Sequence, residues 1–291
     1  MVADAEVPGA SFGERVVEAV AATGPLCVGV DPSRALLEGW GLGDDAPGLR
    51  EFAQRCLDAL AGVVPVIKPQ VAFFERHGAA GLQVLAELMA GARERRLLVI
   101  ADAKRADIGS TSAAYAEAWL SARSDLAADA VTAVPYLGLG ALAPMAELAV
   151  ANRRGLVVVV RSSNPEGRPI QEAVTSLGES VEDLLLGQVA AANAAEGRSV
   201  GSIGVVVGAT LEPSRFDLGT LGGVVLAPGV GAQGAGASDV ARLFGRCAPG
   251  TVLPSVSRSV LVNGPDVGRL RAAARTTLDE LAQVIVRPGG R

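Results

Sequence analysis

The stretch LLVIADAKRAD (residues 97–107) is a continuous apolar run that ends in charged residues. A run that is apolar at nearly every position is typical of a strand buried on both faces of a parallel sheet. Similar short runs, each ending in polar or turn-forming residues and each followed by a helical pattern, occur at 25–33, 63–70, 130–138, 155–165, 201–213, 222–234 and 250–260. The sequence therefore predicts eight strands that alternate with helices.

The expected helices lie at about 47–61, 79–95, 110–124, 141–153, 180–196, 213–220, 238–246 and 265–285. One more is expected near 11–22, before the first strand, where it could close the floor of a barrel. Eight strand–helix units without a compositional break predict an α/β fold, a single (β/α)8 TIM barrel domain over residues 1–291. Its parts are an N-terminal helix within 1–24, the strands within 25–261 and a C-terminal helix at 265–285. A doubly wound open sheet is the alternative, but it does not need eight evenly repeated units.

The composition limits the classes of partner. Hydrophobic residues make up 49% of the chain and charged residues 20%, which is enough for a large core. The net charge is −5 and there is no basic block, so no nucleic-acid partner is expected, whereas a phosphate-bearing small molecule is compatible with local donors. We see no signal-peptide pattern, and the apolar runs are short or broken, so we expect a cytoplasmic chain without a membrane span.

The rarer residue types argue against several kinds of site. Cys27, Cys56 and Cys247 are odd in number and widely spaced, which predicts reduced thiols rather than disulfides. The single histidine, His77, excludes a His-rich metal site, and we interpret it as a surface residue at the entry to a helix.

Polar residues fall at the predicted carboxyl ends of the strands, the end where (β/α)8 barrels hold their active sites. Side chains alternate along a strand, so Asp102 and Lys104 share a face. If Leu98 and Ile100 precede them on that face, both charged groups point into the barrel mouth. An adjacent carboxylate keeps the Lys104 ammonium charged and fixes its position. Asp107 then falls in the loop before the next helix.

Each of these residues has a structural alternative. The charged pair at the end of strand three could be a structural ion pair, and Asp107 an ordinary helix N-cap. Lys68, at the end of the second strand, could extend to solvent, while Asp31 and Ser163 could be turn residues. All of these alternatives would have to hold together to explain polar residues at five strand ends, so we favour a shared site.

An anion site is predicted after strands seven and eight, where many barrels bind phosphate. In PGVGAQGAG (228–236), glycines such as Gly231 and Gly234 let backbone N–H groups approach a phosphate, and Gln233 adds an amide donor. Arg258, in SRS (257–259), can hold two phosphate oxygens with its planar guanidinium. A flexible glycine linker is the alternative for the first segment. Residues 164–180 and 229–236 are candidates for a lid.

Five segments together resemble a known family. DAKRADIGST (102–111), KPQVAFFE (68–75), RSSNP (161–165), PGVGAQG (228–234) and SRSV (257–260) resemble segments of the orotidine 5′-monophosphate decarboxylases, in particular the longer bacterial type 2. The match runs from Asp31 to about Leu261, with the segments in order. It implies the reaction of orotidine 5′-monophosphate to UMP and CO2, the last step of de novo pyrimidine nucleotide synthesis, with no metal or organic cofactor. Ala106 departs from the glycine of many relatives but removes no functional group.

The same resemblance implies roles for individual residues. The catalytic array is carried over onto Lys68, Asp102, Lys104 and Asp107, and Lys104 would stabilise a vinyl carbanion and then protonate it. Asp107, with Ile108 and Thr111, would reach the neighbouring subunit's site in a homodimer. The remaining implied substrate contacts are ribose to Asp31 and Lys68, the pyrimidine amide to Ser163, and phosphate to Gly231, Gln233, Gly234 and Arg258.

Two other functions stay open at this point. A magnesium-dependent sugar-phosphate lyase or decarboxylase on a related barrel can share a DxKxxD strand end, and it would lose activity in EDTA. A catalytically silent barrel would bind UMP without turning over the substrate.

Overall fold

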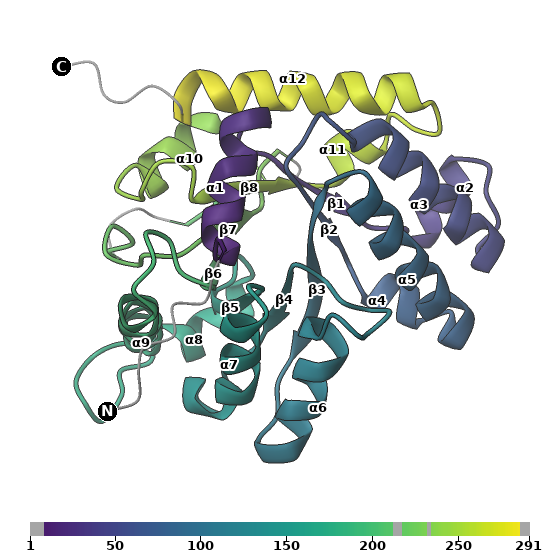
Figure 1. Ribbon diagram of the computed structural model, residues 1–291. Coiled ribbons are helices and arrows are strands. Elements are labelled where there is room, and N and C mark those ends of the chain that lie inside the picture. Colours follow the sequence, from purple (N-terminus) through teal and green to yellow (C-terminus); the bar gives the residue numbers. More distant parts are fainter. Residues whose placement is uncertain (1–8, 212–216, 232–233, 286–291) are drawn as a thin grey trace.

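The computed structural model describes residues 9–211, 217–231 and 234–285. Its parallel strands form a closed barrel in sequence order, with the eighth strand paired to the first (Figure 1). The strands are β1 Cys27–Val30, β2 Val66–Pro69, β3 Leu98–Arg105, β4 Ala130–Ala133, β5 Gly155–Arg161, β6 Ile203–Val207, β7 Val225–Pro228 and β8 Val252–Val256. The predicted barrel is therefore confirmed, and the open-sheet alternative is wrong.

Helices surround the barrel on its outside (Figure 1). The longer helices on the outside are α3 Ala46–Leu60, α5 Gly78–Glu94, α6 Gly109–Leu120, α7 Ala143–Ala151, α9 Val181–Glu196, α10 Ala237–Phe244 and α12 Val267–Ile285, whereas α1 Phe12–Thr23 lies at one end of the barrel. Short helical turns lie at α2 Arg34–Gly39, α4 Ala72–Glu75, η1 Leu139–Leu142, η2 Pro165–Gly167, α8 Arg168–Gln171 and α11 Arg258–Leu261. Most of these short turns follow a strand on the side where the barrel opens.

The prediction of a helix at 213–220 is wrong for residues 217–220, the part of this range that the structure describes. Residues 217–220 form loop and turn, and 213–216 lie outside the described residues. The Asp217 carboxylate accepts a hydrogen bond from the backbone N–H of Gly219 at 3.0 Å. A local side-chain bond of this kind competes with helix formation, and the nearby glycines add to the cost of a helix.

Capping residues account for where several helices begin. Ser11 and Glu14 form a reciprocal capping box at the start of α1. The Asp45 carboxylate accepts from the N–H of Gly48 at 2.8 Å at the start of α3. Ser180 caps α9 in the same way, so local sequence signals define these boundaries.

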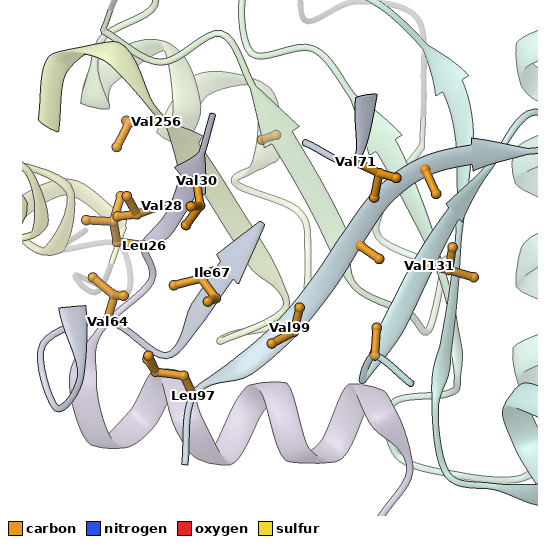
Figure 2. Packing of buried hydrophobic residues seen from close by; sticks show 14 of the residues in the cluster. Leu26, Val28, Val30, Val64, Ile67, Val71, Leu97, Val99, Val131 and Val256 are labelled. Carbon is orange, nitrogen blue, oxygen red and sulfur yellow. The ribbon is translucent and has the colours of Figure 1, made fainter. Parts of the chain in front are cut away.

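The hydrophobic core has two layers that follow the alternation of side chains along the strands. Val28, Ile67, Val99 and Val131, on neighbouring strands, belong to the large outer cluster between the barrel and its helices (Figure 2). The residues between them face the barrel interior and form a second cluster, which includes Cys27, Val66, Ile100, Val157 and Leu253. Because the strands are covered on both faces, their sequences are largely apolar, and most of their polar residues lie toward the carboxyl ends.

Helix α1 closes one end of the barrel, as predicted. Phe12, Val16 and Val20 are buried in the inner cluster together with the interior strand residues. The Phe12 ring packs against Gly155 so closely that a Cβ there would lie 2.3 Å from it. The barrel is thereby filled from its amino-terminal end, and the carboxyl ends of the strands stay open for a site.

The cysteines are free thiols, with Cys27 and Cys56 buried and Cys247 partly covered. Across the described part of the chain, no helix is both long and apolar enough to cross a membrane.

We predict that Phe12→Ala lowers the free energy of unfolding by about 3–5 kcal/mol, because it removes a fully buried ring from the barrel floor. Urea denaturation followed by circular dichroism measures the change. Val262→Ala is the control, since Val262 is exposed and its loss should cost less than about 0.5 kcal/mol. Equal stability of the Phe12→Ala protein and the wild type would show that α1 does not help to close the barrel.

Candidate active site

A pocket of about 480 Å³ opens at the carboxyl ends of the strands, away from α1. Its wall is apolar at several interior positions and polar at the strand ends. The polar lining residues are Asp31, Ser33, Lys68, Gln70, Asp102, Lys104, Ser162, Ser163, Ser255, Ser257 and Arg258. The structure thus brings together polar residues from the ends of five strands, β1, β2, β3, β5 and β8, in one pocket.

Strand β3 supplies the central charged pair. Leu98 packs against the inner cluster and Ile100 is part of it, and Asp102 and Lys104 follow on the same face and line the pocket. The predicted alternation is therefore present. After Asp102 the backbone departs from a regular strand, because Lys104 has φ = +49° and the register with β4 shifts between Ala101 and Arg105. A left-handed conformation at a residue other than glycine costs about 1–3 kcal/mol and is common at functional sites.

The Asp102 carboxylate receives three hydrogen bonds from side chains. Lys68 donates from Nζ to Oδ2 at 3.0 Å, and Lys104 donates from Nζ to Oδ1 at 2.7 Å. Thr132 donates from its hydroxyl to Oδ1 at 2.9 Å. Asp102 and Lys104 do form an ion pair, which the sequence left open as a purely structural contact. The pair lines the pocket, however, and Asp102 forms a second ion pair with Lys68.

Lys68 does not extend to solvent, since only 9% of its side chain is exposed. Burial opposes its charge, but the neighbouring Asp102 and Asp31 carboxylates outweigh burial and raise the pKa of Lys68 above its ordinary value. Burial likewise disfavours ionised Asp102, yet the Lys68 and Lys104 ammonium groups lower the pKa of that carboxyl to about 2. Lys68 and Asp102 are therefore both charged at neutral pH.

Lys68 and Lys104 are the only lysines in the sequence, which contains 26 lysines and arginines in all. Both of them line the pocket, and every other basic side chain apart from His77 is an arginine. This bias is a signal for the site that sequence reasoning missed. Lys104 is the more accessible of the two, with 48% of its side chain exposed, so its ammonium can meet a ligand in the pocket.

Several pocket residues are available to a ligand. Asp31 Oδ1 and the Ser257 hydroxyl are buried and have no hydrogen-bond partner among the described residues. Such groups are costly unless something pairs with them, and a bound ligand can do so. Arg258 begins α11 at the pocket rim with an exposed side chain, so its guanidinium is accessible to an anion. Ser163 also lines the pocket.

Three of the predicted site residues do not line the pocket of their own chain. Asp107 is partly buried, while Ile108 and Thr111 are exposed, and none of the three lines the pocket. The N-cap of α6 is Ile108, without a side-chain cap, so the reading of Asp107 as that helix's N-cap is wrong. The Asp107 carboxylate accepts instead from the N–H of Ile108 at 2.8 Å.

The glycine-rich loop is only partly described. Gly229 and Val230 line the pocket, whereas Gly231 and Gly234 are not among its lining residues. Gln233 lies outside the described residues. Gly231 has φ = +74° and Gly234 has φ = +95°, conformations that favour glycine and that bend the loop back on itself. This observation favours a defined turn over a flexible linker.

Sequence reasoning missed Gln70, Ser162 and Ser257 as lining residues. Gln70 follows Lys68 by two positions, so strand alternation was a usable signal for it. Ser257 precedes Arg258 directly, but nothing in the sequence indicated that its hydroxyl would be buried without a partner.

His77 is less exposed than expected. It stands at the N-cap of α5, as a helix-entry residue should, but only 11% of its side chain is exposed. Its Nε2 lies 3.6 Å from Asp44 Oδ1, in the loop before α3.

The segment 164–180, one of the two lid candidates, is attached to the end of β5. Arg161 is buried there and forms ion pairs with Glu172 and with Glu182, the latter at 3.0 Å. The Gln171 amide donates to the Ser162 hydroxyl at 2.9 Å. These contacts tie the segment to the residues that line the pocket.

We predict a specific acid dependence of stability. The folded-state pKa of Asp102, about 2, lies below its unfolded value, so its contribution is complete above about pH 4 and is lost as the pH falls through about 2. In Asp102→Asn this titration is absent. The stability difference between wild type and Asp102→Asn should therefore shrink by up to about 2 kcal/mol between pH 5 and pH 2, as measured by chemical denaturation. Parallel pH curves for the two proteins would contradict the lowered pKa.

Comparison with known proteins identifies the family. The model of the orotidine 5′-phosphate decarboxylase / HUMPS family matches residues 24–273. Proteins named orotidine 5′-phosphate decarboxylase from Salinispora arenicola and Corynebacterium glutamicum (strain R) are 50% and 48% identical over 268 and 274 residues, covering 92% of this chain and 96% and 97% of theirs. A solved Streptomyces avermitilis structure named for the same activity has a TM-score of 0.92 at 48% identity, covering 96% of this chain and 97% of that one. This chain belongs to the orotidine 5′-phosphate decarboxylase / HUMPS family.

Proposed function

We propose that this chain decarboxylates orotidine 5′-monophosphate to UMP and CO2, the last step of de novo pyrimidine nucleotide synthesis. The observation that carries the proposal is the Lys68–Asp102–Lys104 array inside a pocket that has Arg258 at its rim. The similar bacterial proteins are named for this activity and not for a sugar-phosphate lyase. That favours the nucleotide reaction over the magnesium-dependent alternative.

In this proposal, each part of the substrate has a partner in the pocket. Arg258 and the backbone at Gly229 and Val230 can hold the phosphate, with Gln233 as a further donor. Asp31 and Lys68 contact the ribose. The Asp31 Oδ1 atom, which is buried without a hydrogen-bond partner among the described residues, accepts a hydrogen bond from a ribose hydroxyl. Ser163 then hydrogen-bonds the pyrimidine amide. This arrangement directs the scissile carboxylate toward β3.

The reaction needs a charge that is fixed in advance. When the carbon–carbon bond breaks, its electron pair stays on a vinylic ring carbon, CO2 leaves, and the carbon takes a proton from the Lys104 ammonium. No cofactor absorbs the electrons in this scheme. The protein alone must therefore lower the activation barrier, by an amount toward the upper end of the ~8–23 kcal/mol that is typical of enzymes. An ammonium held by Asp102 does so without reorganising during the reaction. The Asp102 charge also faces the departing carboxylate, which disfavours the bound ground state.

We also propose that the chain acts as a homodimer in which Asp107 and Thr111 complete the partner's site. Exposed apolar side chains lie on the loops after β3 and β4, with Ile108 61%, Tyr136 78% and Leu137 52% exposed. The two loops are joined, because the N–H of Val134 donates to the carbonyl of Arg105 at 3.0 Å. An exposed apolar patch beside catalytic residues is typical of a protein contact.

The central prediction concerns turnover. Purified protein should remove the absorbance of orotidine 5′-monophosphate in the presence of EDTA, and Lys104→Ala should lower kcat by at least about a hundredfold, because it removes the charge and the proton that the reaction needs. Arg246→Ala is the control, since it removes an exposed cation ahead of β8, at the closed end of the barrel.

Three results would contradict the proposal. Binding of UMP without any turnover indicates a silent barrel. Loss of activity in EDTA that magnesium restores indicates the metal-dependent lyase. Full activity of Lys104→Ala removes this lysine from the chemistry.

The dimer proposal predicts complementation between inactive variants. A mixture of Lys104→Ala and Asp107→Ala chains should regain about a quarter of wild-type activity at full subunit exchange, since half the dimers are mixed and each carries one intact site. A mixture of Lys104→Ala with Asp102→Ala is the control and should stay inactive, because both residues belong to the same side of the site. No recovery despite demonstrated subunit exchange would show that Asp107 acts within its own chain.

A further inference from the structure

Thr132 is the single polar residue of β4 and is fully buried. Its hydroxyl donates to Asp102 Oδ1 at 2.9 Å and accepts from the backbone N–H of Lys104 at 3.0 Å. It is fully enclosed and is not among the residues that line the pocket. One hydroxyl therefore joins the carboxylate of one candidate catalytic residue to the backbone of the next.

The second of these bonds occurs where the sheet is irregular. The pairing of β3 with β4 is regular from Ile100 to Ala101 and resumes only at Arg105. Between these points Lys104 takes φ = +49°, and its N–H bonds to the Thr132 side chain rather than to a strand backbone. The conformation that aims the Lys104 side chain into the pocket is thus supported by the Thr132 hydroxyl.

We propose that Thr132 is a positioning residue for the decarboxylation, an inference that rests on the proposed function. Asp102 Oδ1 has two donors, the Lys104 ammonium and the Thr132 hydroxyl. Without the hydroxyl, the carboxylate can rotate together with the ammonium, and the Lys104 backbone loses its partner. The distance from the ammonium to the reacting carbon is then no longer fixed.

The effect should fall on chemistry rather than on binding. Arg258, Asp31 and Ser163 lie at the ends of other strands, and the hydrogen bonds of the Thr132 hydroxyl go to Asp102 and Lys104, so the groups that hold phosphate, ribose and base keep their places. Misplacing a catalytic group by about 1 Å can cost about a hundredfold in rate. Loss of the hydroxyl should therefore lower kcat and leave KM nearly unchanged.

The test compares Thr132→Ser with Thr132→Ala, since both lose the methyl group and only the first keeps the hydroxyl. We expect Thr132→Ser to keep kcat within about threefold of wild type and Thr132→Ala to lower it roughly tenfold to a hundredfold, with KM and the Kd for UMP within about threefold in both. Thr132→Val, which keeps the side-chain volume, gives the same comparison with Thr132→Ser if the alanine variant does not fold.

Thr251 offers a matched control at the closed end of the barrel. It is buried, and its hydroxyl donates to the Ala248 carbonyl at 2.7 Å. Thr251→Ser and Thr251→Ala should have equal kcat, even where the melting temperature falls. Equal loss of kcat in Thr132→Ser and Thr132→Ala, or a rise in KM that matches the fall in kcat, would overturn the proposal.

A second measurement does not depend on turnover. Because the sequence contains two lysines, protein labelled at lysine Cε with ¹³C gives two lysine side-chain signals, which Lys104→Arg assigns. The Lys104 signal should move in Thr132→Ala and stay near its wild-type position in Thr132→Ser. An unchanged Lys104 signal in Thr132→Ala would refute the positioning role. An inactive wild type with the expected signal shift would instead refute the proposed function and leave the contact established.

Discussion

The site depends on one carboxylate. Asp102 lies at the open end of the barrel interior, where a charge is costly unless it is paired, and it accepts from Lys68, Lys104 and Thr132 at 2.7–3.0 Å. Lys68 is charged despite its burial because Asp102 and Asp31 are close to it. Asp102 in turn is ionised despite its burial because the Lys68 and Lys104 ammonium groups lie beside it. Removing the Asp102 carboxylate would leave the buried Lys68 ammonium without its nearest ion-pair partner, so these two charges depend on each other.

The barrel makes this unit geometrically accessible to a substrate. Residues on neighbouring parallel strands stand side by side, which places the carboxyl ends of β2, β3 and β4 around Asp102. Helix α1 fills the amino-terminal end with Phe12, so the interior is packed below the charges and open above them. On β3, Ile100 is buried in the core and Lys104, four residues further along the chain, lines the pocket, so one strand contributes both to the core and to the site.

Much of this was predictable because it follows from short-range rules. Alternation put Asp102 and Lys104 on one face, and the apolar runs separated by helical patterns indicated the barrel. The left-handed conformation of Lys104 and its bond to Thr132 were not predictable, since they depend on a register shift between strands that are distant in sequence. The helix expected at 213–220 failed where Asp217 forms a local turn. Asp107 and Thr111 belong, on the proposed assembly, to another chain's site, which one folded chain does not reveal.

The choice of lysine at both cationic positions has a physical reason. A guanidinium keeps its proton in proteins, whereas an ammonium can donate one and afterwards recover it. Lys104 must give up a proton in the proposed reaction, so arginine cannot replace it. Lys68 is enclosed beside Asp102 and Asp31, where it presents a compact point charge instead of the planar fork of arginine. In a chain that uses arginine for every other side-chain cation apart from His77, these two demands explain why lysine remains at both places, and why both places are in the pocket.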